Sequence, residues 1–237
     1  MSLEMRKISS INQNSEGLRA YFSKIYTYMA GALSVSAMTA YLAIKEPFIN
    51  LFYKMTDKGL SLSLLGILAM IAPLIMVFFI SSNKLSLSKV RVFYWVFSAL
   101  MGISFSSALL FYTAGSVFQI FLVTAGSFLG MSLYARTSQR DFSAWGSFLF
   151  MGVIGLVLTM VINLFFQSNF LTMALSLISV VLFSGLTIYD TQRLKYMYSD
   201  SLTDDERDSV ALRGALSLYI NFINIFLSLL NLFGERR

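Results

Sequence analysis

Five stretches of this chain contain no charged residue, and their lengths constrain the fold more than any other feature. They comprise residues 25–44, 59–83, 92–135, 142–189 and 214–234. A helix needs about 20 apolar residues to cross a bilayer. The stretches of 20, 25 and 21 residues each accommodate one spanning helix, and those of 44 and 48 residues accommodate two each. We therefore predict an all-α integral membrane protein built as a seven-transmembrane-helix bundle.

The polar segments divide the chain around this bundle. We predict a polar N-terminal tail over residues 1–24, partly disordered up to about Ser15, then a membrane domain over residues 25–234 and a short C-terminal tail over residues 235–237. The polar tail is longer than the polar part of a typical signal peptide, and the first apolar stretch is long enough to span a membrane. We therefore expect that this region is not removed as a signal peptide. The chain is 57% hydrophobic and only 13% charged, which agrees with one membrane domain.

Two local patterns refine this prediction. Thr203 followed by Glu206 has capping-box spacing, which predicts a helix that begins at Thr203 and continues into the last span. Gly126 and Gly130 are separated by three residues, as in helices that pack closely. We interpret this pair as packing within the chain and expect a monomer. The spans are expected near residues 25–44, 60–80, 92–112, 117–134, 145–166, 170–190 and 214–234, with a turn over residues 113–116.

The positions of Lys and Arg predict the orientation. With the N-terminus in the cytoplasm, 13 of the 18 Lys and Arg residues fall in cytoplasmic segments and 5 on the opposite side. Cytoplasmic loops carry the excess of these residues in membrane proteins. The sequence therefore predicts a cytoplasmic N-terminus and a C-terminus on the far side. The positive charges lie in loops, so the net charge of +6 is not a sign of nucleic-acid binding.

Several function classes lack the residues they need. The chain contains no Cys and no His, which excludes disulfides, thiol chemistry and histidine-based metal sites or proton relays. A retinal protein needs a lysine in the last span, and residues 214–234 contain none. An intramembrane protease needs paired Asp residues or a Ser and a His, and the predicted spans contain neither pair. We therefore expect no enzymatic activity and no bound cofactor.

The last two spans carry polar stripes at helical spacing. Asp190, the one candidate carboxylate in a membrane segment, follows Thr187 near the end of the sixth span. Lipid offers no hydrogen bonds, so such faces should turn toward other helices or a wet cavity. In the seventh span the stripe is formed by Ser217, Asn221, Asn224, Ser228 and Asn231.

These residues allow a functional and an ordinary interpretation. A carboxylate deep in a membrane is costly and usually functional, but Asp190 could also be an interfacial residue paired with Arg193 or Arg213. Hydroxyl and amide side chains between membrane helices commonly stabilise packing by roughly 0.6–2 kcal/mol each. Asn221 lies two turns inside the seventh span and can face Asp190, so Asp190 and Asn221 are candidates for an ion pathway or pH-sensing site, with Thr187, Ser217, Asn224 and Ser228 in support. The residues alone leave both interpretations open.

Five stretches resemble the bacterial branch of the Bax inhibitor-1 family, the transmembrane BAX inhibitor motif proteins. The stretches are residues 19–30, 102–107, 134–146, 189–192 and 215–224. The resemblance covers nearly the whole chain in the same order. It implies a seven-helix bundle in a bacterial inner membrane, a pH-sensitive calcium leak, and association with the membrane-anchored protease FtsH.

In family members with the calcium-leak site, a carboxylate in helix six faces one in helix seven. Asp190 matches the first of these, whereas Asn221 occupies the second position. The resemblance thus implies an incomplete di-aspartyl site here. Two functions remain open: a weak, pH-modulated leak for calcium and other cations, and a non-transporting membrane regulator that interacts with FtsH or stress machinery.

Overall fold

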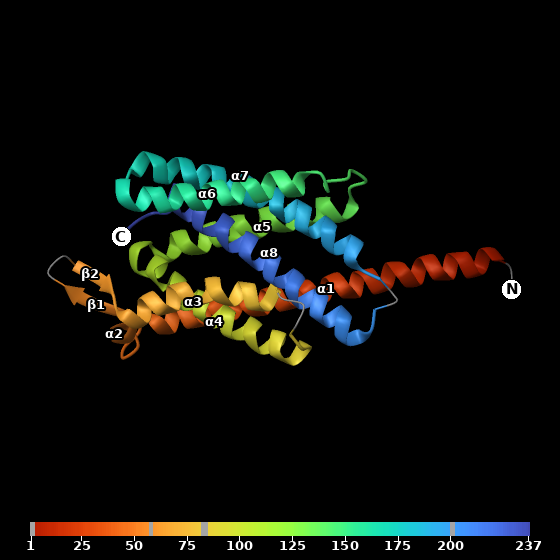
Figure 1. The fold of residues 1–237 in the computed structure, drawn as a ribbon, viewed down its shortest axis with the longest axis horizontal. Helices are drawn as coiled ribbons and strands as arrows, with labels where there is room; N and C mark the ends of the chain where they lie inside the picture. The colour runs from red at the N-terminus through yellow and green to blue at the C-terminus, as the bar shows by residue number, and fades with distance from the viewer. Residues whose placement is uncertain (1–2, 57–58, 82–84, 200–201) are drawn as a thin grey trace. The chain divides into compact units, whose positions relative to one another are not determined.

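The computed structural model describes residues 3–56, 59–81, 85–199 and 202–237, most of which are helical (Figure 1). The predicted helical fold is confirmed. The elements follow the order α1 (Leu3–Ala43), α2 (Ile49–Phe52), β1 (Tyr53–Thr56), β2 (Gly59–Leu62), α3 (Leu64–Ser81), α4 (Leu87–Phe111), α5 (Ala114–Thr137), α6 (Trp145–Phe166), α7 (Asn169–Met197) and α8 (Asp204–Phe233).

Five helices in the described residues, α4 to α8, are long and apolar enough to cross a membrane. The apolar stretch Leu64–Ile80 of α3 is shorter, and α1 joins a polar segment to the first uncharged stretch. The chain is thus a membrane protein with several apolar helices. The count of seven spans stays a prediction.

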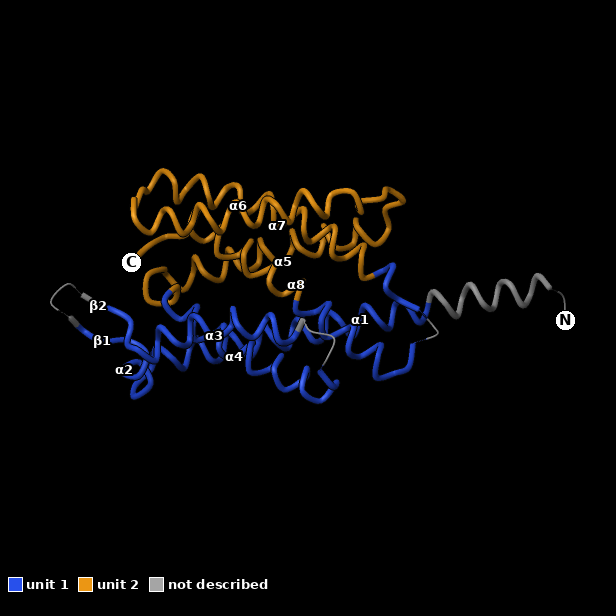
Figure 2. The backbone as a smooth tube through the Cα atoms, viewed as in Figure 1, with its two compact units in different colours: residues 1–107, 195–216 blue, residues 108–194, 217–237 orange. Residues whose placement is uncertain are grey.

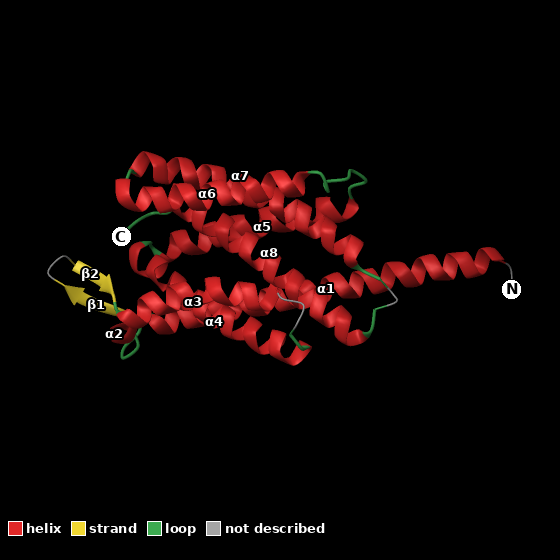
Figure 3. Ribbon diagram, viewed as in Figure 1, coloured by secondary structure: helices red, strands yellow, loops and turns green. Residues whose placement is uncertain are grey.

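Two elements depart from the sequence expectations. The helix α1 extends back to Leu3, whereas we expected partial disorder up to about Ser15. Residues 45–58 were expected to form a loop, but they include the short helix α2 and the strand β1, which pairs antiparallel with β2. Tyr53 lies opposite Leu62 in this hairpin, which stands out among the helices in Figure 3. The hydroxyls of Tyr53 and Ser106 share a 2.8 Å hydrogen bond, which ties the hairpin to α4.

The capping box is confirmed at the start of α8. The hydroxyl of Thr203 accepts from the backbone N–H of Glu206 at 3.3 Å, and the carboxylate of Glu206 accepts from the N–H of Thr203 at 2.9 Å. These bonds satisfy backbone donors that the first turn of a helix leaves unpaired. The helix therefore begins in the polar loop and continues into the last apolar stretch.

The chain forms two compact units (Figure 2), and each is built from discontinuous segments. The first unit comprises Met1–Ser107 and Lys195–Leu216, and the second comprises Ala108–Leu194 and Ser217–Arg237. The division falls near the ends of α4 and α7 and within α8. The second unit contains the predicted polar residues of both final spans.

In the first unit, α1 and α4 make close polar contacts. The hydroxyl of Ser36 donates to the carbonyl of Ser98 at 2.7 Å, and that of Thr39 donates to the carbonyl of Ala99 at 3.0 Å. Gly102 lies where a side chain would meet Thr39 and the backbone of Ser36. Hydroxyl groups and a glycine thus allow the two helix backbones to approach closely, as in membrane helix pairs.

In the second unit, α6 packs on α7 through leucines, and α5 packs on α8 through aromatic rings. The ring of Phe222 lies 5.6 Å from the rings of both Phe121 and Phe128, in edge-on arrangements. Such pairs add about 0.5–1.5 kcal/mol beyond the area that they bury. The buried leucines of the α6–α7 cluster are Leu149, Leu156, Leu175 and Leu182.

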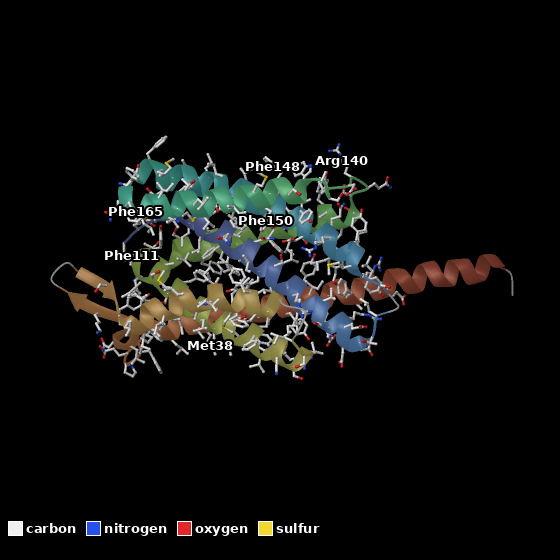
Figure 4. All side chains as sticks on the ribbon, viewed as in Figure 1. Met38, Phe111, Arg140, Phe148, Phe150 and Phe165 are labelled. Atoms are coloured by element: carbon white, nitrogen blue, oxygen red, sulfur yellow. The ribbon has the colours of Figure 1, made fainter. Side chains whose placement is uncertain are left out.

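Large apolar side chains cover the outside of α6. Phe148, Phe150 and Phe165, labelled in Figure 4, are all exposed, Phe165 by 84%. A surface of this kind suits a lipid environment, since lipid-facing positions need no hydrogen-bonding groups. The Gly126–Gly130 pair is also exposed on α5, and an added Cβ would meet nothing within 4 Å at either position. The expectation that this pair mediates packing within the chain is therefore wrong for the described residues.

Candidate functional site

The carboxylate of Asp190 on α7 lies against α8 in the second unit. The Ser217 hydroxyl donates to its Oδ2 at 2.6 Å, and the Asn221 side-chain amide donates to the same oxygen at 2.8 Å. Asp190 is 8% exposed and Asn221 is 3% exposed. The site is therefore a nearly buried carboxylate with two neutral donors.

Helical spacing explains how α8 supplies both donors. Ser217 and Asn221 are four residues apart, so their side chains lie one above the other on the same face of the helix. That face meets Asp190 near the end of the predicted sixth span. Both side chains donate hydrogen bonds to the carboxylate, which lipid cannot do.

The two donors converge on one oxygen of the carboxylate. Within the described residues, every hydrogen bond of the Asp190 side chain falls on Oδ2. The charged side chain of Arg193 is exposed one turn further along α7, and the guanidinium of Arg213 donates to the carbonyl of Ile80 at 3.1 Å, within the first unit. Asp190 is thus held by neutral groups, unlike the interfacial ion pair that we considered from the sequence.

The other selected residues lie on these helices without bonding to Asp190. The Thr187 hydroxyl donates to the carbonyl of Phe183 at 2.8 Å, and the Asn224 amide donates to the carbonyl of Ile220 at 2.8 Å. Both bonds stay within the residue's own helix. Ser228 is buried two turns beyond Asn221. Further along, Asn231 accepts a 2.9 Å hydrogen bond from the hydroxyl of Tyr112.

The two residues that follow Asp190 also make buried polar contacts, and the sequence interpretation assigned them no role. The hydroxyl of Thr191 lies 3.1 Å from that of Ser132 on α5. The side chain of Gln192 accepts from the N–H of Phe142 at 2.7 Å and donates to the carbonyl of Arg140 at 2.6 Å. The available signals were their position next to Asp190 and their place in the stretch over residues 189–192 that resembles the family. Neither signal indicates the partners of Gln192, which are backbone groups.

The site has a limited chemical capacity. It presents one carboxylate, one hydroxyl and one carboxamide, and the described residues contain no group of three or more acidic, His or Cys side chains placed to hold a metal ion. A single carboxylate can attract a cation or exchange a proton. Its attraction for a divalent ion is weaker than that of two facing carboxylates, because the Coulomb energy scales with the charge.

Comparisons with known proteins agree with the motifs found in the sequence. Residues 18–237 match the family described as inhibitor of apoptosis-promoting Bax1. The inner membrane protein YbhL of Escherichia coli is 39% identical over 96% of this chain and 97% of its own length. A protein of Rickettsia prowazekii is 37% identical over 94% of this chain and 92% of its own length. A protein of Deinococcus radiodurans is 34% identical over the full length of both chains.

Proposed function

Since this chain belongs to the Bax inhibitor-1 family, we propose that it is a multi-pass inner-membrane protein that provides a weak, pH-modulated leak for calcium and other cations. The Asp190 site is the constriction of this leak. The single observation that carries the proposal is the nearly buried carboxylate with its donors Ser217 and Asn221. An acidic side chain kept in a membrane segment is costly and usually serves ion or proton movement.

The proposed topology has seven spans, with the N-terminus in the cytoplasm and the C-terminus in the periplasm. The uncharged stretches and the 13-to-5 distribution of Lys and Arg support it. A similar protein, YbhL, is named an inner membrane protein. Reporter fusions after Arg237 and within residues 198–203 should report opposite sides of the membrane. Reporters on the same side would contradict seven spans.

Asn221 makes the leak weak. An asparagine side chain has nearly the shape of a protonated aspartic acid, and its amide can donate to a carboxylate. The site therefore resembles a carboxylate pair that permanently shares one proton. It carries at most one negative charge, and proton sensing depends on Asp190 alone.

The experiment is a flux assay with purified protein in liposomes. Calcium and potassium fluxes are compared at matched protein density for the parent, Asp190→Asn and the control Asp205→Asn, which makes the same change at an exposed position in the first turn of α8. Asp190→Asn should abolish the pH response between about pH 6 and 8 and reduce the flux, whereas Asp205→Asn should retain both. Unchanged flux and pH response in Asp190→Asn would reduce Asp190 to a packing residue.

The second candidate function is a non-transporting membrane regulator that interacts with FtsH or stress machinery. The polar N-terminal part of α1, before the first uncharged stretch, favours it as a handle for a protease. Deleting residues 2–15 should then lengthen the lifetime of the protein without disturbing membrane insertion. An unchanged degradation rate would argue against this handle, and parent protein that conducts no ion would favour the regulator over the leak.

A further inference from the structure

Three consecutive residues of α7 bind three different parts of the second unit. Asp190 accepts hydrogen bonds from α8, Thr191 contacts Ser132 on α5, and Gln192 binds the loop between α5 and α6. All three are buried. Successive residues of a helix point about 100° apart, since a turn contains 3.6 residues. The three contacts therefore surround α7 and define its rotation about its own axis.

Gln192 makes the contact that joins α7 to a loop. It is 3% exposed and uses both functional atoms of its carboxamide, at 2.7 Å to the N–H of Phe142 and at 2.6 Å to the carbonyl of Arg140. Between these residues, Asp141 accepts hydrogen bonds from the backbone N–H and the hydroxyl of Ser143, at 2.8 and 3.0 Å. The loop is thus shaped by its own side chains to receive the carboxamide.

The geometry at Asp190 tolerates little rotation of α7. Side-chain tips lie roughly 5–6 Å from a helix axis, so a rotation of about 20° moves them by about 2 Å. The hydrogen bonds to Asp190 measure 2.6 and 2.8 Å, and hydrogen bonds weaken beyond about 3.2 Å. A small rotation would therefore separate the carboxylate from Ser217 and Asn221.

We propose that Gln192 is a positioning residue that anchors α7 to the α5–α6 loop and thereby holds Asp190 against Ser217 and Asn221. Its effect on ion flux rests on the function proposed above, whereas its effect on α7 does not. Gln192 lies about 200° around the helix from Asp190, so it acts from nearly the opposite side and touches no transported ion. A change in the loop over residues 140–142 is transmitted to the site through this one side chain.

The first test measures the rotation of α7 without reference to transport. The chain lacks cysteine, so a Ser132→Cys, Thr191→Cys pair reports the α5–α7 contact through the rate of disulfide formation in membranes. Adding Gln192→Leu should slow this rate roughly tenfold, because two buried backbone groups lose their partner. The control Gln139→Leu makes the same change at an exposed position of the same loop and should leave the rate unchanged.

If the Gln192→Leu variant does not fold, Gln192→Glu replaces it in the cross-linking test. Its carboxylate still accepts from the N–H of Phe142 but has no hydrogen to donate to the carbonyl of Arg140. It should give a cross-linking rate between those of the parent and Gln192→Leu. A rate equal to that of the parent in both variants would overturn the inference, whether or not the protein conducts ions.

The second test asks whether Gln192 acts through Asp190. Gln192→Leu should reduce the flux in the parent and have no further effect in the Asp190→Asn background, because the residue being positioned is already removed. Equal losses in both backgrounds would show a general loss of structure and overturn the positioning role. If the parent protein conducts no ion, the proposed leak is refuted. The cross-linking rate alone then decides the role of Gln192.

Discussion

The side-chain amide of Asn221 donates to the carboxylate of Asp190, with 2.8 Å between Nδ2 and Oδ2. A second aspartate in place of Asn221 would bring a like charge to the same distance. Two such carboxylates repel in a site of low dielectric constant and titrate as a coupled unit. The amide removes this repulsion, and it also removes half of the charge that could attract a divalent cation.

The first prediction follows from this contact. Asn221→Asp should strengthen calcium binding and steepen the pH response of calcium flux, since the site then alternates between one and two negative charges. The control is Asn224→Asp, because the Asn224 amide bonds to the carbonyl of Ile220 within its own helix. Flux is measured in liposomes at matched protein density from about pH 6 to 8. Equal effects of the two substitutions would indicate a general effect of added charge.

The second prediction concerns the contact between α1 and α4. A Cβ at Gly102 would collide with the Thr39 hydroxyl and the backbone of Ser36, whereas one at Gly126 would meet nothing within 4 Å. Gly102→Ala should lower the stability by about 1–3 kcal/mol, the usual cost of overpacking, and Gly126→Ala should raise it slightly, because alanine is favoured over glycine in a helix. Thermal unfolding in detergent measures both. Similar melting temperatures would contradict the close approach of the two helices.

The third prediction concerns pH and the capping box of α8. The hydrogen bond from the Thr203 backbone lowers the pKa of Glu206 below its ordinary value of 4.5. Because the pKa is lower in the folded state, this contribution to stability is present above the ordinary value and is lost as the pH falls through the folded value. Acidification should therefore lower the protection of the first amides of α8, when their exchange is compared with the intrinsic exchange rate at each pH.

A matched variant isolates this effect. In Thr203→Ala, the hydroxyl is absent, so exchange in the first turn should already be faster at neutral pH, and acid should change it less. Exchange that responds to acid equally in the two proteins would show that Glu206 does not act through the capping box. Exchange within residues 217–233 serves as the internal reference.

The fourth prediction concerns Tyr21, which lies on α1 before the predicted first span. Its side chain is 3% exposed, and its hydroxyl has no hydrogen-bond partner among the described residues. Burial raises the pKa of this phenol to about 12, so it remains neutral at physiological pH. A buried hydroxyl without a partner costs about 1–3 kcal/mol. Tyr21→Phe should therefore raise the melting temperature, and a lowered one would indicate that the hydroxyl contributes to stability.

The sequence predicted the elements that depend on long, regular patterns. The bounds of α6, Trp145 and Phe166, agree with the prediction because Asp141 precedes its start and the polar residues 167–169 follow its end. The meeting of Asp190 with Asn221 was implied by the family resemblance, and helical spacing was compatible with it. Spacing assigns a side chain to a face, but it does not determine its partner. Thr187 and Asn224 therefore lie on the expected helices and yet bond to their own backbones.

Contacts with no regular signature could not be predicted. Gln192 binds two backbone groups, which every residue possesses, so no residue type identifies its partners. The β1–β2 hairpin has strands of four residues each, too short for a clear alternation of apolar and polar residues. The Gly126–Gly130 spacing permits a close helix contact but does not supply the second helix.

The contacts around α7 also impose an order on biogenesis. Ser132 and the loop over residues 140–142 precede Thr191 and Gln192 in the chain, so they have already been synthesised when α7 emerges from the ribosome. The donors to Asp190 follow it by 27 and 31 residues. During translation, Ser132 and the loop can therefore fix the rotation of α7 about its axis before α8 is synthesised. At that stage the Asp190 carboxylate still lacks both donors. Until α8 is synthesised, burial of the Asp190 carboxylate in lipid would be costly.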